Sequence, residues 1–406
     1  MKVLQVISSL DPKSGGVAEG AIQQAVTLSA MGHTVDTVTL ELPGAAIDAR
    51  LAPDGVFQLG PASSGYAYAA GLAPWLRQHA AKYQVLVVHG LWQYPGFCVR
   101  KVALELGLPY VVFPHGMLDP WFARSYPFKH LKKWLYWPWA QYRVLRDARW
   151  VLFTTAEELQ LARQSFWLYA VRERLVGFGI RHRQLGAQDG RDVFFGKFPE
   201  LRGKRNLLYL SRIHPKKGCD LLIDSFAKVA MLDPALHLVM AGPDQTGWVA
   251  KLRATAAARG ISDRVTFTGM LRGDLKWGAY DAAEVFVLPS HQENFGIVVA
   301  EALASDLPVL TTYNVNIWRE VRDAGAGFIE ADTQAGIDQL LAKWLALSSD
   351  QRQEMRVAAG ACFARYFEIK QVTGKLVDAL LDASSMPKSQ FTFVGSVAEA
   401  WRRRVR

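Results

Sequence analysis

The sequence predicts an α/β protein built from two doubly wound halves. Two observations favour this fold class: short apolar runs rich in β-branched residues alternate with segments of helical periodicity, and polar loops follow the runs. Such alternation is typical of parallel sheets that helices cover on both faces. The 406 residues exceed what one ordinary core holds, and two such halves account for them.

The first half, residues 1–185, is predicted to contain the first of these sheets. A loop at 8–16 follows the first strand, and the next helix ends at a Gly32-His33 stop. The third and fourth strands lead into His89 and His115. The strands are predicted at 3–7, 34–40, 84–88 and 110–113.

The second half, residues 186–375, begins within a polar stretch and resumes the alternation of strands and helices. Residues 376–406 are expected to form a C-terminal helix and tail that packs back toward the first half. Ligands of open α/β sheets bind beyond the carboxyl ends of the strands, so two facing halves predict a cleft between them. The strands are predicted at 206–210, 236–241, 265–268, 285–288 and 308–311, and the helices at 218–231, 248–259 and 295–304.

Composition narrows the classes of function. Half of the residues are hydrophobic and 21% are charged, which excludes a mainly disordered chain. The three cysteines lie far apart, so no disulfide framework and no zinc site are expected. This cysteine usage predicts a cytoplasmic location. No run of about 18 apolar residues predicts a membrane span. The 47 Lys and Arg against 37 Asp and Glu give a net charge of +10, which predicts an anionic partner.

Two glutamates eight residues apart, Glu293 and Glu301, flank the start of a predicted helix. Glu293 follows a strand, where its carboxylate can accept hydrogen bonds from ligand hydroxyls. The backbone N–H groups of 294–297 open the helix and attract phosphate. The alternative is an acidic residue that complements the helix dipole, with a solvated glutamate further along the helix.

A basic loop at 211–218 follows another predicted strand. Arg212 and Lys217 bracket this loop, and their side chains are suited to the oxygens of a diphosphate. Gly218 lets the chain enter the next helix closely. Lys216 is interpreted as an ordinary solvated lysine.

Together these two segments resemble the donor half of a GT-B-fold glycosyltransferase of family 4 (group 1). That family combines an SR-x(4)-KG loop with an E-x7-E segment, and a strand that ends in Gly-Pro lies between them, here Gly242-Pro243. The resemblance covers most of 206–330 and, more loosely, the first half. The segment 313–320 departs from it, because many relatives have a glycine-containing turn there.

The resemblance implies two Rossmann-like domains that face an interdomain cleft, the first binding the acceptor and the second the donor. It implies a retaining, metal-independent hexosyltransferase with no cofactor, a nucleotide-diphosphate sugar as donor substrate and a glycan or lipid-linked acceptor, in surface polysaccharide or glycolipid biosynthesis. It assigns catalysis to His115 and Glu293; the donor diphosphate to Arg212, Lys217 and Gly16; the donor sugar to Glu293, Asn294, Phe295 and Gly296; and the nucleoside to Glu301, Gly269, Met270 and Leu271.

A basic, aromatic segment at 121–150 carries five of the thirteen tryptophans. Seven Lys and Arg against one Asp give it a charge of +6. Interleaved basic and aromatic residues suit an anionic bilayer, which predicts a peripheral position on the inner face of the cell membrane. The alternative is a helix whose tryptophans belong to the core. Binding of nucleic acid is not expected, because no recognised nucleic-acid module accompanies the segment.

Two other classes of function remain open. A nucleotide-sugar epimerase shares the predicted fold, and the Arg212–Lys217 loop with the paired glutamates favours the transferase over it. A non-enzymatic, basic peripheral membrane binder is the third class, and failure to bind any nucleoside diphosphate supports it.

Overall fold

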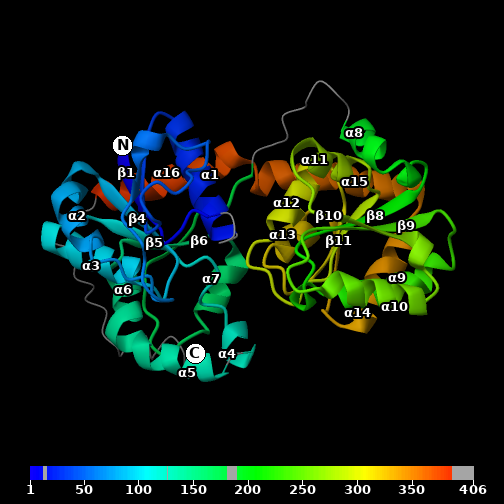
Figure 1. Cartoon of the computed structure of the whole chain (residues 1–406), viewed down its shortest axis with the longest axis horizontal. Coiled ribbons are helices and arrows are strands. Elements are labelled where there is room, and N and C mark those ends of the chain that lie inside the picture. Colours follow the sequence, from blue (N-terminus) through cyan, green and yellow to red (C-terminus); the bar gives the residue numbers. More distant parts are fainter. Residues whose placement is uncertain (12–15, 126, 181–189, 386–406) are drawn as a thin grey trace. The chain divides into compact units, whose positions relative to one another are not determined.

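The computed structural model describes residues 1–11, 16–125, 127–180 and 190–385 (Figure 1). The chain divides into two compact units. The first comprises Met1–Gly179 together with the chain from Ile369 on, and the second comprises Ile180–Glu368. The sequence-based boundaries lie at 185 and 375, a few residues beyond these two points.

The first unit contains a seven-stranded parallel sheet in the order β3-β2-β1-β4-β5-β6-β7. The side chains of β4 are buried throughout, which explains its uninterrupted apolar sequence. The strands are β1 (Lys2–Val6), β2 (Thr34–Thr39), β3 (Val56–Gln58), β4 (Val85–His89), β5 (Tyr110–Phe113), β6 (Trp150–Phe153) and β7 (Glu173–Leu175).

Helices cover both faces of this sheet. Leu4 and Val6 of β1 pack into a core with α2, α3 and α6, whereas Val3 points to the other face and packs with α16. The C-terminal helix α16 is therefore part of the core of the first unit. The helices are α1 (Gly16–Ala30), α2 (Leu72–His79), α3 (Tyr94–Leu106), α4 (Trp121–Ser125), α5 (Pro127–Tyr136), α6 (Tyr142–Asp147), α7 (Ala156–Ala162) and α16 (Ile369–Ser385).

The second unit contains a six-stranded parallel sheet in the order β10-β9-β8-β11-β12-β13. The helices α9, α10 and α14 lie on one side of it and α11, α12 and α15 on the other (Figure 1). The strands are β8 (Arg205–Leu210), β9 (Leu236–Ala241), β10 (Val265–Gly269), β11 (Val285–Leu288), β12 (Val309–Thr312) and β13 (Gly327–Glu330), and the helices are α8 (Gly190–Lys197), α9 (Cys219–Ala230), α10 (Trp248–Ala258), α11 (Gly273–Asp281), α12 (Ile297–Ala304), α13 (Trp318–Asp323), α14 (Gln334–Leu345) and α15 (Ser349–Tyr366).

The structure confirms the predicted α/β class with two doubly wound parallel sheets. Predicted strands at 110–113, 236–241 and 285–288 match β5, β9 and β11 residue for residue. The sequence-based prediction missed β3, β6, β7 and β13, which have three or four residues each and lie at or next to sheet edges. Among the helices that the structure describes, none is long and apolar enough to cross a membrane.

Candidate functional site

The loops after β8 and β11 interlock at the carboxyl edge of the second sheet. Gly218 adopts a positive φ of 66°, and a Cβ there would lie 2.1 Å from the carbonyl oxygen of Pro289. The backbone N–H of His291 donates to the carbonyl oxygen of Lys216 at 2.9 Å. This close approach brings the predicted diphosphate loop against the loop that carries Glu293.

Lys217 and Glu293 form an ion pair where these loops meet. Lys217 is only 5% exposed, so its ammonium is largely withdrawn from water. The backbone of Glu293 is held on both sides, since its N–H donates to Asn314 O at 2.9 Å and its carbonyl accepts from Asn316 N–H at 3.1 Å. The segment that departs from the family pattern thus positions Glu293. The structure brings these two predicted residues together.

Glu301 lies in α12, and its carboxylate has two partners that the sequence did not reveal. Lys276 Nζ contacts one carboxylate oxygen at 2.6 Å, and the Tyr280 hydroxyl donates to the other at 3.0 Å. Burial, and then the charge of Glu301, hold the pKa of Tyr280 well above its usual range, so the hydroxyl keeps its proton. Each carboxylate oxygen retains a lone pair for a further donor.

The other predicted donor-sugar residues, Asn294, Phe295 and Gly296, lead from Glu293 into α12. Gly296 is the N-cap at a φ of 80°, the left-handed conformation that glycine adopts without strain. Phe295 is buried, and its ring meets the Phe367 ring at a centroid distance of 5.6 Å. Asn294 Oδ1 accepts from Asn316 Nδ2 at 3.5 Å. Phe295 therefore offers its backbone rather than its side chain to a ligand.

Arg212 lies on the loop after β8 with an exposed side chain, and its carbonyl oxygen accepts from the Tyr209 hydroxyl at 2.9 Å. At the end of β10, Gly269 accepts a hydrogen bond from the N–H of Gly242 at 2.8 Å. Met270 is exposed and Leu271 is buried. Gly269 is the last residue of β10, and Arg212, Met270 and Leu271 follow the carboxyl ends of β8 and β10.

In the first unit, His115 follows β5 at a strained φ of 51°. Its Nε2 lies 3.0 Å from Nδ1 of His89; His89 is buried and His115 is half-buried. Glu158 fixes the turn, because its carboxylate accepts the N–H of Gly116 at 2.6 Å and the N–H of Thr154 at 2.8 Å. The sequence analysis did not identify Glu158.

Gly16, at the end of the loop predicted at 8–16, is the first residue of α1. Ser14 and Gly15 lie outside the described residues. One turn into α1, a Cβ on Gly20 would lie 3.8 Å from Cε1 of His115. His115 therefore packs against the start of the helix that Gly16 opens.

Burial lowers the pKa of His115 to about 4, and burial together with His115 holds the pKa of His89 well below its usual range. Both imidazoles are consequently neutral near pH ~7. A neutral imidazole has one N–H donor and one acceptor nitrogen, so His115 can exchange a hydrogen bond with a hydroxyl but does not supply a positive charge.

Acid is therefore expected to destabilise the first unit through His115. The unfolded chain binds a proton there below pH ~6.5, whereas the folded chain does so only near the lowered pKa of about 4. The free energy of unfolding thus falls as the pH falls between these values, by about 2 kcal/mol at pH ~5. Burial raises the pKa of Glu158, so its protonation on folding stabilises the folded chain as the pH falls and opposes the effect of His115. This opposing contribution is the same in a His115 variant.

Urea unfolding at pH ~7 and ~5 checks this expectation. In a His115→Asn variant the free energy of unfolding should fall less between the two pH values, by about 2 kcal/mol. Asparagine tolerates the left-handed backbone at this position, so the variant removes the titration without adding backbone strain. Parallel falls in the two proteins would contradict the assignment.

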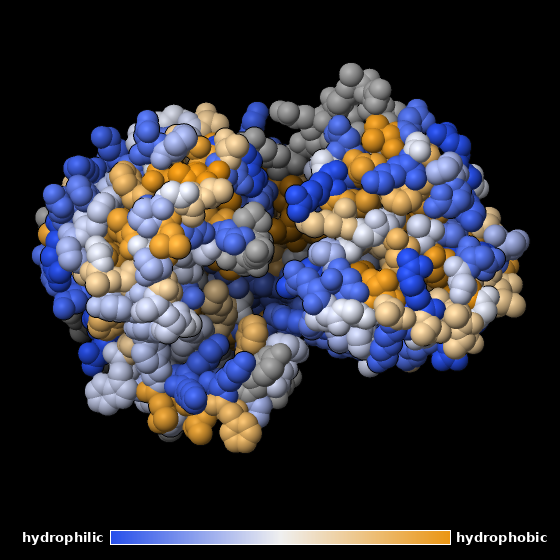
Figure 2. Space-filling model, in the orientation of Figure 1, coloured by the Kyte–Doolittle hydropathy of each residue, from blue (hydrophilic) through white to orange (hydrophobic). Residues whose placement is uncertain are grey.

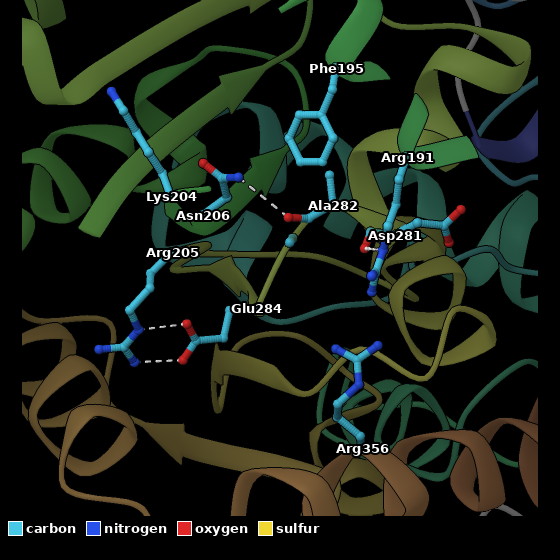
Figure 3. A pocket seen from close by; sticks show the side chains of 10 residues that line it. Arg191, Phe195, Lys204, Arg205, Asn206, Asp281, Ala282, Glu284 and Arg356 are labelled. Carbon is cyan, nitrogen blue, oxygen red and sulfur yellow. Dashed lines mark hydrogen bonds and ion pairs between the residues drawn. The ribbon is translucent and has the colours of Figure 1, made fainter. Parts of the chain in front are cut away.

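A hollow of about 340 Å³ lies at the end of the second sheet opposite the candidate site, among residues next to the amino ends of β8 and β11 (Figure 3). Arg205 spans it with hydrogen bonds of 2.8 and 2.6 Å to the carboxylate of Glu284. Asn206 donates to Ala282 O at 3.4 Å, and Arg191 donates to Asp281 O at 2.7 Å. None of the predicted site residues lines this hollow, so it is separate from the loops at the carboxyl edge.

Two doubly wound units, with a lysine–glutamate pair at the carboxyl edge of the second sheet, define a two-domain α/β protein of the GT-B class. Residues 191–361 match the family described as Glycosyl transferases group 1, and residues 15–179 match the Glycosyl transferase 4-like domain. The chain belongs to the GT-B-fold glycosyltransferases of family 4.

Some similar proteins match only part of this chain, and others match nearly its whole length at lower identity. A D-inositol 3-phosphate glycosyltransferase of Geodermatophilus obscurus is 36% identical over 159 residues, which are 36% of this chain and 35% of that protein. The chain thus spans about a third of the length of this relative. A GDP-mannose:cellobiosyl-diphosphopolyprenol alpha-mannosyltransferase of Xanthomonas oryzae is 26% identical over 400 residues, 96% of this chain and 99% of that protein.

Solved structures share the fold along nearly the whole chain. HepE of Anabaena, solved with UDP and glucose, has a TM-score of 0.72 at 18% identity and covers 94% of this chain and 100% of its own. A glycosyltransferase of Rickettsia africae has a TM-score of 0.76 at 15% identity, over 95% of this chain and 99% of its own. At these identities the likeness concerns the fold alone.

Proposed function

We propose that this protein transfers a hexose, with retention of anomeric configuration and without a metal, from a nucleoside-diphosphate sugar to a lipid-linked glycan. The observation that supports the proposal is the Lys217–Glu293 pair, because a lysine suits a diphosphate and a carboxylate beside it suits sugar hydroxyls. The full-length similarity to a mannosyltransferase that acts on a diphosphopolyprenol-linked glycan supports this donor and acceptor class.

The electrostatics of the loop after β8 support the same proposal. Burial first, and then the charges of Arg212, Lys216 and Lys217, lower the pKa of His214 within this loop. A neutral His214 among three cations marks a positive potential that favours an anion. When the sugar leaves, charge develops on the departing diphosphate, and preorganised cations stabilise that charge more than they stabilise the ground state.

The proposal gives the remaining predicted residues definite partners on the donor. Glu301, steadied by Lys276 and Tyr280, accepts hydrogen bonds from the ribose hydroxyls. The N–H groups at the start of α12, beyond Gly296, receive phosphate or sugar oxygens. His115 of the first unit exchanges a hydrogen bond with the transferred sugar. Surface polysaccharide or glycolipid synthesis is the setting that such an acceptor implies.

The test is acceptor-dependent release of nucleoside diphosphate. The protein is incubated with GDP-mannose or UDP-glucose, with and without a polyprenyl-diphosphate-linked glycan, and the product is analysed by proton NMR at the anomeric centre. We expect release only with acceptor, retention in the product, and the same rate with and without EDTA. Conversion of the donor sugar to an epimer without acceptor would identify an epimerase instead, and loss of activity in EDTA would refute metal independence.

A further inference from the structure

Helix α5 presents an apolar stripe to solvent. Phe128, Leu131 and Leu135 are 86%, 57% and 60% exposed, and their spacing of three and four residues places them on one face of the helix. No residue of α5 is buried. The segment after α5 adds Trp139, which is 72% exposed. Soluble proteins rarely leave such a continuous apolar surface uncovered without a use for it.

The opposite face of α5 is the one that packs against the first unit. His130 stacks on Phe166 at a centroid distance of 5.1 Å, and Lys133 Nζ lies 4.7 Å from the centre of the Trp92 ring. Trp137, further along the chain, is fully buried and stacks on Phe166 at 4.2 Å. The helix therefore turns a histidine and a lysine inward and its phenylalanine and leucines outward, the reverse of an ordinary surface helix.

The sequence left two explanations of the basic, aromatic segment open, a membrane-facing surface or a helix with core tryptophans. The structure shows which tryptophans are buried and which are exposed. Trp137 belongs to the core, and Trp150 starts β6 with its Nε1 donating to Asp382 at 2.8 Å. Trp134 and Trp139 are exposed, and the Trp134 ring lies 6.4 Å from the exposed Trp167. Hydrophobic atoms gather at the end of the first unit where α5 lies (Figure 2).

Along the chain, the segment that carries the stripe has charged residues of one sign. No Asp or Glu occurs between Asp119 and Asp147 in the sequence. Lys129 and Lys132 of α5 are exposed beside the apolar stripe, and Arg143 is exposed on α6. A helix with apolar residues on its outer face and lysines at the flank matches the boundary between acyl chains and anionic headgroups.

We infer that α5 docks on an anionic phospholipid bilayer, with Phe128, Leu131 and Leu135 among the acyl chains and Lys129 and Lys132 at the headgroups. The inference rests on exposure and charge alone and is independent of the proposed sugar transfer. It goes beyond that function by identifying the part of the first unit that meets the membrane. Burial of the three apolar side chains and attraction of the two lysines to anionic headgroups both add to the expected affinity.

Flotation with phospholipid vesicles tests the inference on the full chain. We expect binding to vesicles that contain phosphatidylglycerol, weak binding to pure phosphatidylcholine, and release at high salt. A Leu131→Ser/Leu135→Ser variant should lose at least about tenfold in partitioning. The matched control is Met231→Ser/Leu232→Ser, because these residues of the second unit are 80% and 78% exposed and should leave binding unchanged.

A second pair of variants tests the contribution of the lysines to vesicle binding. Lys129→Gln/Lys132→Gln should weaken binding to the anionic vesicles by about tenfold, whereas Lys197→Gln/Lys251→Gln removes two exposed lysines of the second unit and should not. Absence of binding to either vesicle at low salt would overturn the inference. So would a dimer in solution that the Leu131→Ser/Leu135→Ser variant dissociates, because the stripe would then be covered by a second copy.

Discussion

A Glu293→Gln variant should lose about 10²- to 10³-fold in the rate of sugar transfer while still binding nucleoside diphosphate. Glutamine keeps the shape of the side chain and removes the charge that pairs with Lys217. On the proposed function, the carboxylate holds the sugar and the lysine holds the diphosphate, so the defect should appear in turnover rather than in nucleotide affinity.

The same variant should be less stable without ligand, because Lys217 is 5% exposed and loses its counter-charge. Leaving one member of a fully buried pair alone costs about 3–5 kcal/mol, and we expect a smaller loss here because the Glu293 side chain is 25% exposed. A bound diphosphate returns an anion to the lysine. Thermal unfolding with and without GDP and UDP measures both effects. An Asp338→Asn control breaks the Lys228–Asp338 pair between α9 and α14 and should leave transfer unchanged. Transfer at a near-normal rate in Glu293→Gln would remove Glu293 from the site.

A Gly218→Ala variant should destabilise the second unit by more than about 3 kcal/mol. The added Cβ would lie 2.1 Å from the carbonyl oxygen of Pro289, and φ is 66°. Both the strain and the clash act where the two loops of the candidate site interlock. We therefore expect loss of nucleotide binding together with loss of stability.

A Gly260→Ala variant measures the cost of backbone strain without the steric clash that Gly218→Ala adds. Gly260 has a similar φ of 71°, but a Cβ there meets nothing within 4 Å. It should cost about 1–2 kcal/mol, the expense of a left-handed alanine, and leave nucleotide binding intact. Urea unfolding of both variants gives the comparison. Equal losses in the two would show that the close approach to Pro289 does not matter.

Local patterns in the sequence were enough to predict where the loops after β8 and β11 lie in the fold. Lys217 and Glu293 each follow a buried strand, so a parallel sheet carries them to one edge, and the structure pairs them. The partners of Glu301 were not predictable in this way. Lys276 and Tyr280 lie on α11, where they look like ordinary surface and core residues until α11 packs beside α12.

The role of Glu158 and the missed strands also could not be predicted, because both depend on tertiary packing. Glu158 is 42 residues from Gly116 in sequence, and only the fold brings its carboxylate to that N–H. The strand β6 begins at Trp150, the last residue of the basic, aromatic segment, and has only four residues, so its pairing with β5 and β7 decides its conformation. Tertiary packing also separated the buried Trp137 from the exposed Trp139.

Calorimetric titration of the protein with GDP and with UDP tests the central claim most directly. The account predicts that at least one of them binds, and that Lys217→Gln weakens the binding by at least about tenfold while Lys251→Gln, a variant of an exposed lysine on α10, does not. Absence of binding by both nucleotides, or equal binding by all three proteins, would contradict the placement of a nucleoside-diphosphate sugar at the Lys217–Glu293 pair.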